Sequence, residues 1–444
     1  MTPRLTPLDP WIASKIGTPG QAVARAALDA YQLACLQATL NFAVEKSRFY
    51  REHMPDAPRE LHSLADLARL PFTSAEDIRR QPLSFVCVSQ GDIHRVVTLD
   101  TSGTTGTPKR LYFTRDDQAL TVDFFHTGMS TFTDPGDRVL ILLPCERPGS
   151  VGDLLAVGLQ RLGAAPIKHG PVRDMAQALS VLRGEGANGL VGIPTQVLAL
   201  ARYSPGLKIK SVLLSTDHVP EALRHGVEQA WRCRVFNHYG MTEMGLGGGV
   251  ECEARRGYHL READMYFEVV NPVSGEPVAD GEMGEVVFTT LTRQGMPLVR
   301  YRTGDLSRFV PGDCPCGTRL KTLEWVRRRA GGPVLDNGAP LSLADLDEVL
   351  FAVEGVFDFS AALTRSAAAD CLNVTLRAVE SAAGMQLTVI REALLAIPGL
   401  RAACATGRLK VEVSVQTGPA VPRPAKRQIA DRRTTGQGAE AVGI

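Results

Sequence analysis

The sequence predicts a multidomain protein of the α/β class, with a large N-terminal domain of α/β sheets plus a β layer and a small C-terminal α+β domain. Three observations lead to this prediction. The chain has 444 residues, more than one hydrophobic core usually organises. Its middle part alternates short apolar runs with amphipathic stretches. A glycine-rich interruption then follows a β-rich stretch near residue 330.

Hydrophobic spacing predicts the order of the elements in the larger domain. Residues 23–50 and 60–79 repeat apolar positions at helical spacing, and Thr73 and Ser74 before Glu76 resemble a capping box. Buried strands are expected at residues 95–99, 139–143, 190–191, 212–214 and 235–236, and helices at residues 175–182 and 220–231. Ligands of such α/β sheets bind at the C-terminal ends of the strands, so the loops that follow them are candidate sites.

A β-rich stretch precedes the predicted domain boundary. Strands are expected at residues 268–271, 284–290, 300–305 and 307–310. Gly331-Gly332-Pro333 interrupts the chain, and a helix at residues 343–353 and strands near Ala361 and at residues 410–415 are expected beyond it. We therefore expect domains at residues 1–329 and 330–433, followed by a disordered tail at residues 434–444.

Composition favours a small-molecule ligand. Lys and Arg number 49 against 48 Asp and Glu, so no global field would hold the chain on nucleic acid or an anionic membrane. The first twenty residues lack the apolar core of a signal peptide, and no later segment has the length and apolarity of a membrane span, which predicts a cytoplasmic protein. Nine cysteines, dispersed except for Cys314 and Cys316, indicate reduced thiols rather than a disulfide framework.

The strongest chemical signal is a loop rich in hydroxyl groups and glycine that follows the strand expected at residues 95–99. Glycine lets backbone N–H groups turn toward an anion, hydroxyls add donors, and a lysine adds a point charge. Pro108 and Arg110 exclude a Walker loop, and a plain surface loop is the alternative. The expected phosphate-binding residues are Ser102, Gly103, Thr104, Thr105, Gly106, Thr107 and Lys109.

Two further clusters come after predicted strands. In Asn237-His238-Tyr239-Gly240-Met241-Thr242-Glu243, a tyrosine face could pack on a purine, a hydroxyl could reach a phosphate, and a carboxylate could bind Mg²⁺. In Arg300-Tyr301-Arg302-Thr303-Gly304-Asp305, the final aspartate could accept hydrogen bonds from ribose hydroxyls. Taken alone, the first cluster also fits core and turn, and the second fits a structural aspartate in a turn.

Together and in this order, the three segments resemble the adenylate-forming superfamily of acyl-CoA synthetases, and most closely the phenylacetate-CoA ligase family. The resemblance covers roughly residues 70–349. It extends through Leu70-Pro71-Phe72-Thr73, Gly192-Ile193-Pro194-Thr195, Glu282-Met283-Gly284-Glu285 and Thr289-Thr290-Leu291.

The resemblance implies a role for each site residue. The loop at residues 102–109 would wrap the ATP phosphates, Tyr239 would stack beside adenine, Thr242 would touch the α-phosphate, Glu243 would hold Mg²⁺, and Asp305 would bind the ribose. The remaining nucleotide-binding candidates are Ser215, Thr216, Asp217, Asn237, His238, Gly240, Met241 and Arg329.

The implied activity is ATP-dependent activation of an aryl or arylacetic acid as an acyl-adenylate, followed by a thioester with coenzyme A. Lys426 is the candidate adenylation lysine, with a solvated basic tail as the alternative. Gly331 and Gly332 could act as a hinge for a mobile C-terminal domain, although the family's acidic hinge residue is missing. Two alternatives stay open. The enzyme could transfer the acyl group to an amine or a carrier-protein thiol, or the chain could be a paralogue that binds a nucleotide without catalytic activity. The resemblance to this family also allows the protein to be a homodimer.

The acyl pocket is expected at residues 143–152 and 245–249, by analogy with aryl-binding relatives. Glu146 and Arg147 suggest a polar substituent on the acid, with an exposed surface pair as the alternative. A separate structural zinc site is expected from four soft or borderline ligands, which suit tetrahedral Zn²⁺, with ordinary reduced thiols as the alternative. These ligands are Cys252, His259, Cys314 and Cys316.

Overall fold

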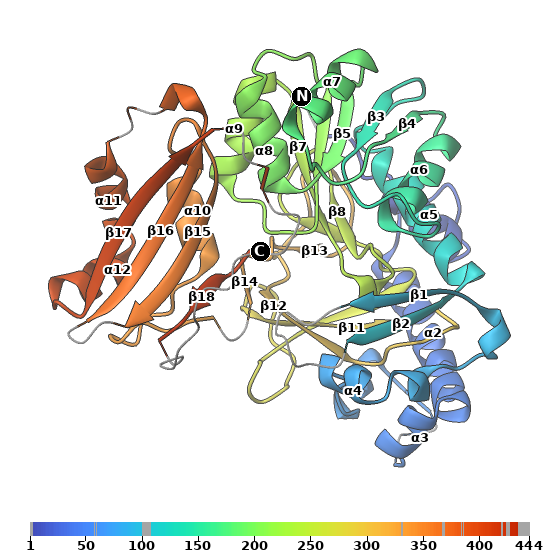
Figure 1. Ribbon diagram of the computed structural model, residues 1–444. Coiled ribbons are helices and arrows are strands. Elements are labelled where there is room, and N and C mark those ends of the chain that lie inside the picture. The colour runs from blue at the N-terminus through green and yellow to red at the C-terminus, as the bar shows by residue number, and fades with distance from the viewer. Residues whose placement is uncertain are drawn as a thin grey trace. The chain divides into compact units, whose positions relative to one another are not determined.

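The protein is described from a computed structural model (Figure 1). The structure describes residues 3–56, 58, 60–99, 108–329, 332–365, 369–382, 384, 386–418, 421–422 and 427–433. Its contacts divide the chain into two compact units. Unit 1 comprises Met1–Gly170, Ala187–Val191 and Phe236–Ala330, and unit 2 comprises Pro171–Gly186, Gly192–Val235 and Gly331–Ile444.

One break between the units falls between Ala330 and Gly331, beside the expected domain boundary. Unit 2 also contains two segments from the first 329 residues, because these pack with the C-terminal part of the chain. The expected functional division into an N-terminal and a mobile C-terminal domain stays a prediction. The mixed α/β class itself is confirmed, with several sheets and helices in both units.

The N-terminal part of unit 1 is mainly helical, as predicted. It contains α1 (Leu8–Lys15), α2 (Arg25–Lys46), α3 (Arg48–His53), η1 (Leu64–Arg69), α4 (Ala75–Arg80), η2 (Pro82–Phe85) and η3 (Gln90–Asp92). The helix expected at residues 60–79 is two short helices, because Thr73 between them is extended and bridges Tyr301. The capping box at α4 uses Asp77 rather than Glu76: Asp77 N donates to Ser74 Oγ at 3.2 Å.

Parallel strands and two helices form the α/β part of unit 1. Strands β4 (Ala165–Lys168), β3 (Arg138–Ile141) and β5 (Gly189–Gly192) are neighbours and run parallel. Helices α5 (Arg115–Met129) and α6 (Val151–Arg161) pack against each other. A second, antiparallel run joins β7 (Arg234–Tyr239), β8 (Gly249–Glu251), β9 (Tyr258–Leu260) and β13 (Thr322–Leu323).

The predicted β layer is a separate four-stranded sheet in unit 1 with the order β10-β11-β12-β14. Its strands are β10 (Met265–Val270), β11 (Gly284–Thr290), β12 (Tyr301–Ser307) and β14 (Arg328–Arg329). The strand expected at residues 307–310 is wrong. Strand β12 ends at Ser307, and Phe309 makes one isolated bridge, since the chain turns at Pro311-Gly312. Strands β1 (Ile93–Leu99) and β2 (Lys109–Thr114) form an antiparallel pair.

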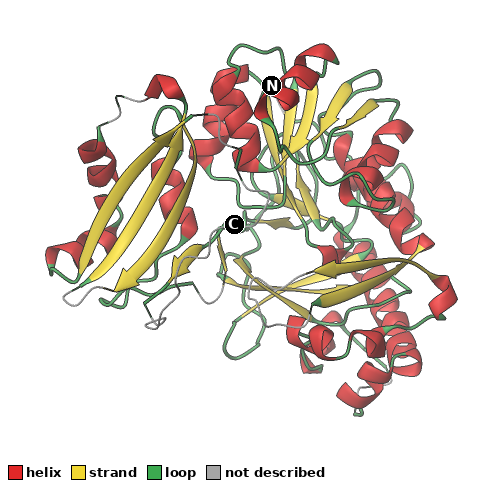
Figure 2. Ribbon diagram, in the orientation of Figure 1, coloured by secondary structure: helices red, strands yellow, loops and turns green. Residues whose placement is uncertain are grey.

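Unit 2 holds α7 (Met175–Gly184), α8 (Pro194–Tyr203), β6 (Ser211–Leu214), α9 (Glu221–Trp231), α10 (Leu343–Leu350) and a four-stranded sheet with the order β17-β16-β15-β18. The strands are β15 (Val356–Arg365), β16 (Asp370–Ala378), β17 (Leu409–Thr417) and β18 (Ile429–Asp431). Helices α11 (Leu387–Leu395) and α12 (Pro398–Ala405) pack beside β17 (Figure 2). This is the α+β arrangement predicted for the C-terminal part.

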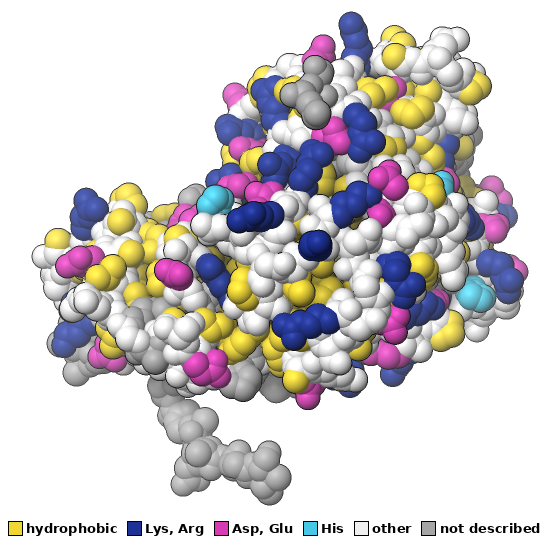
Figure 3. All heavy atoms as spheres, turned by 90° about the horizontal axis from the view of Figure 1, so that it is seen from above, with side chains coloured by type: hydrophobic (Ala, Val, Ile, Leu, Met, Phe, Trp, Pro, Cys, Tyr) yellow, Lys and Arg dark blue, Asp and Glu magenta, His cyan; other side chains and the backbone are white. Residues whose placement is uncertain are grey.

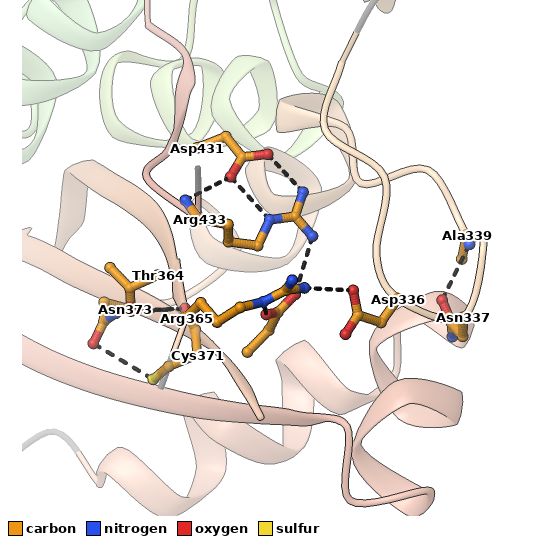
Figure 4. Close-up of polar contacts among 10 residues, drawn as sticks. Asp336, Asn337, Ala339, Thr364, Arg365, Cys371, Asn373, Asp431 and Arg433 are labelled. Atoms are coloured by element: carbon orange, nitrogen blue, oxygen red, sulfur yellow. Dashed lines mark hydrogen bonds and ion pairs between the residues drawn. The ribbon is translucent and has the colours of Figure 1, made fainter. Parts of the chain in front are cut away.

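An ion-pair network fixes the short strand β18 at the edge of that sheet. Figure 4 shows Arg433, just past the strand, turned toward Asp431 and toward Arg365. Arg433 Nη1 lies 3.0 Å from Asp370 Oδ2, and Arg365 Nε lies 2.8 Å from Asp370 Oδ1. Arg365 also reaches Asp336 at 2.8 Å. Two guanidinium groups thus share one buried carboxylate at the end of the sheet.

The surface carries charges of both signs. On the face seen in Figure 3, basic and acidic side chains are interspersed, in keeping with the near-balanced composition. Within the described ranges, no helix combines the length and the apolar character needed to cross a bilayer.

Candidate active site

The candidate active site of unit 1 forms where β2, β7 and β12 end or begin. Strand β7 ends at Tyr239, and the chain then makes the short 3₁₀ turn η4 (Thr242–Met244). Gly240 allows the close return of the chain, because a Cβ atom there would lie 2.4 Å from the Leu246 carbonyl oxygen. Gly245 ends the turn in the left-handed region at φ 67°. This tight loop presents Glu243 toward β2 and β12.

Glu243, Lys109 and Tyr301 form one buried polar cluster. The Lys109 ammonium group donates a hydrogen bond to Glu243 Oε1, and the Tyr301 hydroxyl donates to the same oxygen at 3.0 Å. Lys109 Nζ also lies 3.4 Å from the Tyr301 hydroxyl. The Glu243 residue is 4% exposed and Tyr301 is 2% exposed. The structure therefore pairs the predicted phosphate-binding lysine directly with the predicted magnesium ligand, and a tyrosine hydroxyl contacts both.

The electrostatics of this cluster keep Glu243 ionised. Burial alone would raise the pKa of its carboxyl, but the charge of Lys109 and the hydrogen bonds from Lys109 and Tyr301 outweigh burial and lower the pKa below its ordinary value. A charged, hard oxygen ligand is what Mg²⁺ requires, so the carboxylate fits the predicted metal role.

Tyr239 and Asp305 form a second polar contact beside the first. The Tyr239 hydroxyl donates to Asp305 Oδ2 at 3.1 Å, and its ring stacks on Tyr258 with 5.6 Å between ring centroids. Asp305 lies on β12 after Gly304, whose φ of 74° is in the left-handed region. Strand β14 pairs with β12 so that Arg329 lies in register opposite Asp305. The sequence-predicted adenine and ribose residues are therefore hydrogen-bonded to each other.

Buried groups support the strand that carries these residues. The Asn237 backbone N–H donates to Glu251 Oε2 at 2.7 Å, and Trp325 Nε1 donates to Glu251 Oε1 at 2.6 Å. Burial lowers the pKa of His238 to about 4, so its ring is neutral near pH 7. The His238 ring lies 6.1 Å from that of Phe125. The His238 ring therefore packs beside the aromatic side chains of helix α5.

The expected acyl-pocket segment at residues 245–249 packs closely on helix α5. A Cβ atom at Gly247 would lie 2.4 Å from Phe124 Cδ1, and the Thr121 hydroxyl donates to the Gly245 carbonyl at 2.7 Å. The backbone of this segment therefore lies directly against an aromatic side chain.

Two groups of predicted residues are not among the contacts described above. Ser102–Thr107 and Lys426 fall outside the described residues. Ser215, Thr216 and Asp217 belong to unit 2, where Thr216 adopts a φ of 80°.

Asp217 is engaged by a residue to which the sequence assigned no role. Arg427 Nε lies 3.2 Å from Asp217 Oδ2, and the same guanidinium binds both oxygens of Asp347 at 2.6 and 3.0 Å. Burial raises the pKa of Asp347 to about 7, against the opposing charge of Arg427. The residue that follows Lys426 is thus anchored within unit 2.

Two site residues were missed by sequence reasoning. Tyr301 was part of a recognised motif but had no role, and Arg300 beside it is 1% exposed. Their position directly before the predicted ribose aspartate was the available signal. Nothing local in the sequence indicates that the Tyr301 hydroxyl reaches Glu243, 58 residues earlier in the chain.

A second cluster in unit 1 contains all four predicted zinc ligands. The ligand atoms of Cys252, His259, Cys314 and Cys316 lie within 4.8 Å of one another, and all four residues are buried. Cys252 Sγ lies 3.7 Å from Cys314 Sγ, and Cys316 Sγ lies 3.5 Å from His259 Nε2. The Thr322 hydroxyl lies 3.5 Å from His259 Nδ1, which leaves Nε2 toward the sulfur atoms. Three thiols and one imidazole fit the donor set of structural Zn²⁺.

Comparison with known proteins places this site in context. The chain matches the family of AMP-binding enzymes over residues 52–292. A phenylacetate-coenzyme A ligase of Thermus thermophilus is 29% identical over 357 residues, covering 76% of this chain and 78% of that protein. One of Pseudomonas putida is 30% identical over 303 residues, covering 64% and 67%.

A solved structure has a similar fold. The crystal structure of 2-hydroxyisobutyryl-CoA ligase in the postadenylation state, in complex with R3-HIB-AMP, matches with a TM-score of 0.78 and 23% identity. The match covers 92% of this chain and 91% of that one.

Proposed function

This chain belongs to the AMP-binding enzyme family as an adenylate-forming acid–thiol ligase, and we propose that it converts an aryl or arylacetic acid to its coenzyme A thioester. The observation that carries the proposal is the convergence of Lys109, Glu243, Tyr239 and Asp305 on one region of unit 1. A lysine and a carboxylate suit a magnesium–triphosphate group, and a tyrosine and an aspartate suit a nucleoside. The phenylacetate-coenzyme A ligase relatives support the choice of acid.

The chemistry requires positioning more than a nucleophilic side chain. The acid's carboxylate attacks the α-phosphorus of ATP, the bond to the β-phosphate oxygen breaks, and pyrophosphate leaves with that oxygen. Lys109 would neutralise phosphate charge, Thr242 would contact the α-phosphate, and Asp305 would hold the ribose. Glu243 would bind Mg²⁺, which when present neutralises charge on the phosphates. Lys426 remains our candidate for the cation beside the attacking carboxylate.

The second half-reaction completes the ligase activity. The thiolate sulfur of coenzyme A attacks the acyl carbonyl of the adenylate, the mixed anhydride bond breaks, and AMP leaves. Transfer to an amine or to a carrier-protein thiol would use the same adenylate and differ only in the acceptor. The acceptor is therefore tested directly rather than inferred from the adenylation site.

We also propose that Cys252, His259, Cys314 and Cys316 bind one structural Zn²⁺. Their close, buried arrangement and the contact of Thr322 with the far nitrogen of His259 support this assignment. Four protein ligands would leave no open coordination position, so the ion would stabilise unit 1 and take no part in the reaction.

The function is tested by an acid-library screen for AMP and pyrophosphate release, run with and without coenzyme A. We expect aryl or arylacetic acids to give the fastest release, and a thioester to form when coenzyme A is added. Lys109→Met should lower the rate about a hundredfold or more, because a cation at the phosphates is lost. Lys15→Met, which breaks a lysine–Asp264 pair elsewhere in unit 1, is the matched control and should remain active.

Two results would contradict the proposal. If no acid supports pyrophosphate release, the adenylating activity itself is wrong. If AMP forms but an amine or a carrier protein replaces coenzyme A as the acceptor, only the assignment of the acceptor is wrong.

A further inference from the structure

Resting on the proposed function, we propose that Tyr301 is a positioning residue that holds Glu243 in place while Lys109 gives way to a divalent cation at the Glu243 carboxylate. The starting point is a conflict between two roles. Lys109 is expected at the ATP phosphates and Glu243 at the metal, yet the two side chains bind each other directly. Binding of a metal–nucleotide complex therefore has to separate them.

Separating this pair is costly unless another group supports the carboxylate. Glu243 is 4% exposed, so water cannot readily replace the lysine. Among the residues that the structure describes, the two side chains that donate to Glu243 are Lys109 and Tyr301. A hydroxyl donor that stays in place would reduce the cost of moving the lysine, and would keep the carboxylate oriented until a metal supplies positive charge.

Tyr301 is built to stay in place. Its residue is 2% exposed, and its ring packs against Phe288 with 5.4 Å between centroids. On the backbone, Thr73 N donates to the Arg300 carbonyl at 3.0 Å and Arg302 N donates to the Thr73 carbonyl at 2.9 Å. These two bonds tie both neighbours of Tyr301 to the segment before helix α4.

Arg300, directly before Tyr301, also holds the start of β12 in place. It adopts a left-handed φ of 46°, which is unfavourable for a residue with a side chain. Its guanidinium is 2.9 Å from Glu268 Oε1 and donates to the Ala68 and Leu70 carbonyls at 2.8 and 2.6 Å. These buried hydrogen bonds support the strained backbone at the start of β12. The Tyr301 hydroxyl is then fixed relative to Glu243, whereas the long Lys109 side chain can move.

Substitution of Lys109, the mobile partner of Glu243, and of Tyr301, its fixed partner, should have different effects. Loss of the lysine would remove the phosphate contact and the nucleotide affinity. Loss of the tyrosine hydroxyl would leave the phosphate contact intact but weaken metal binding. The reason is that Glu243 would stay paired with Lys109 or lose its orientation. A metal-specific defect therefore distinguishes positioning of Glu243 from a general structural role.

The test measures Mn²⁺ binding by electron paramagnetic resonance, in the presence of a non-hydrolysable ATP analogue, for wild type and Tyr301→Phe. We expect Mn²⁺ to bind about tenfold more weakly to the variant, the size of effect that one hydrogen bond to a charged group gives. The Mg²⁺ midpoint for adenylation should rise by a similar factor, while kcat at saturating Mg²⁺ changes less. Tyr266→Phe, on strand β10 of the same sheet, is the matched control and should leave the Mn²⁺ affinity unchanged.

A second measurement keeps the inference testable if Tyr301→Phe is less stable. In a Glu243→Gln background, adding Tyr301→Phe should change Mn²⁺ affinity by less than about twofold, because the carboxylate that the hydroxyl positions is gone. Unchanged Mn²⁺ affinity in the single variant, or an equal loss in both backgrounds, would overturn the role of Tyr301. A wild-type protein that binds neither the nucleotide analogue nor Mn²⁺ would instead overturn the proposed function.

Discussion

At the residue scale, the charge of Glu243 decides what the site can bind. The carboxylate is buried, and Lys109 is the cation that contacts it. A buried carboxylate without a cation takes up a proton, and a protonated acid neither pairs with lysine nor binds a divalent metal. The ionised pair therefore keeps a charged carboxylate available for the Mg²⁺ that we propose at this site.

The pH dependence of Lys109→Met follows from this pair. In the intact protein the Glu243 pKa is below its ordinary value of 4.5, so its charge contributes stability above pH 4.5 that is lost as the pH falls through the folded-state pKa. Without Lys109, burial dominates and raises the pKa, so the variant should lose stability as the pH rises above 4.5. Urea unfolding should be measured for both proteins between pH 4 and 8. The difference in the free energy of unfolding between wild type and the variant should increase with pH and reach about 3 kcal/mol.

Lys15→Met serves as the control for this measurement. Its partner Asp264 keeps a second cation, because Arg261 Nε lies 2.6 Å from Asp264 Oδ2. The difference in unfolding free energy from wild type should therefore be smaller and less dependent on pH. A difference for Lys109→Met that stays constant across the range would mean that Glu243 does not titrate as described.

At the scale of one element, the turn after β7 sets the position of Glu243. The chain leaves the strand at Tyr239 and returns so closely that Gly248 N donates to the Tyr239 carbonyl at 2.9 Å. Leu246 N likewise donates to the Met241 carbonyl at 2.9 Å. This compact loop carries Thr242 and Glu243, the two residues of the segment that are expected to contact the α-phosphate and Mg²⁺. Its shape depends on Gly240, where there is no room for a side chain.

Gly240→Ala should disturb this turn. The added methyl group would lie 2.4 Å from the Leu246 carbonyl oxygen, a backbone atom that cannot move alone. We expect a destabilisation of about 1–3 kcal/mol and a clear loss of adenylation, because the turn shifts Thr242 and Glu243. Gly184→Ala, at a helical position in open space, is the control and should be neutral. Thermal unfolding and pyrophosphate release together would check this, and equal behaviour of the two variants would contradict it.

At the scale of the whole molecule, the cysteine–histidine cluster connects distant parts of unit 1. Cys252 directly follows β8 and His259 lies on β9, whereas Cys314 and Cys316 come after strands β10, β11 and β12 of the β layer. A metal bound here would cross-link segments about sixty residues apart in the chain, which stabilises a fold most when the loop closed is long.

Metal content and stability should therefore change together. Protein purified without added zinc should contain about one equivalent of Zn²⁺ per chain, and its removal by a chelator should lower Tm. Cys252→Ser should lower both metal content and Tm, whereas Cys233→Ser, at a buried thiol outside the cluster, should leave the metal content unchanged. Less than about half an equivalent of zinc in the wild-type protein would contradict the site.

The sequence alone determined the features that short stretches of chain encode. Hydrophobic spacing predicted β7 and the strands β10, β11 and β12 of the β layer, but neither β14 nor the end of β12 at Ser307. Glycine, hydroxyl and acidic residues after the predicted strands indicated which loops to expect at the site. The order of these motifs was sufficient to identify the family. These features depend on residues a few positions apart, so local propensity and spacing contain the information.

The tertiary structure decided which of those residues meet. Lys109 and Glu243 are 134 positions apart, and no local pattern specifies that they pair or that Tyr301 joins them. The strained backbone of Arg300 exists because distant carbonyl groups and Glu268 surround its side chain. Packing likewise assigned residues 192–235 to the unit of the C-terminal sheet. Such contacts arise from the burial of surfaces that are remote in sequence, so only the folded chain specifies them.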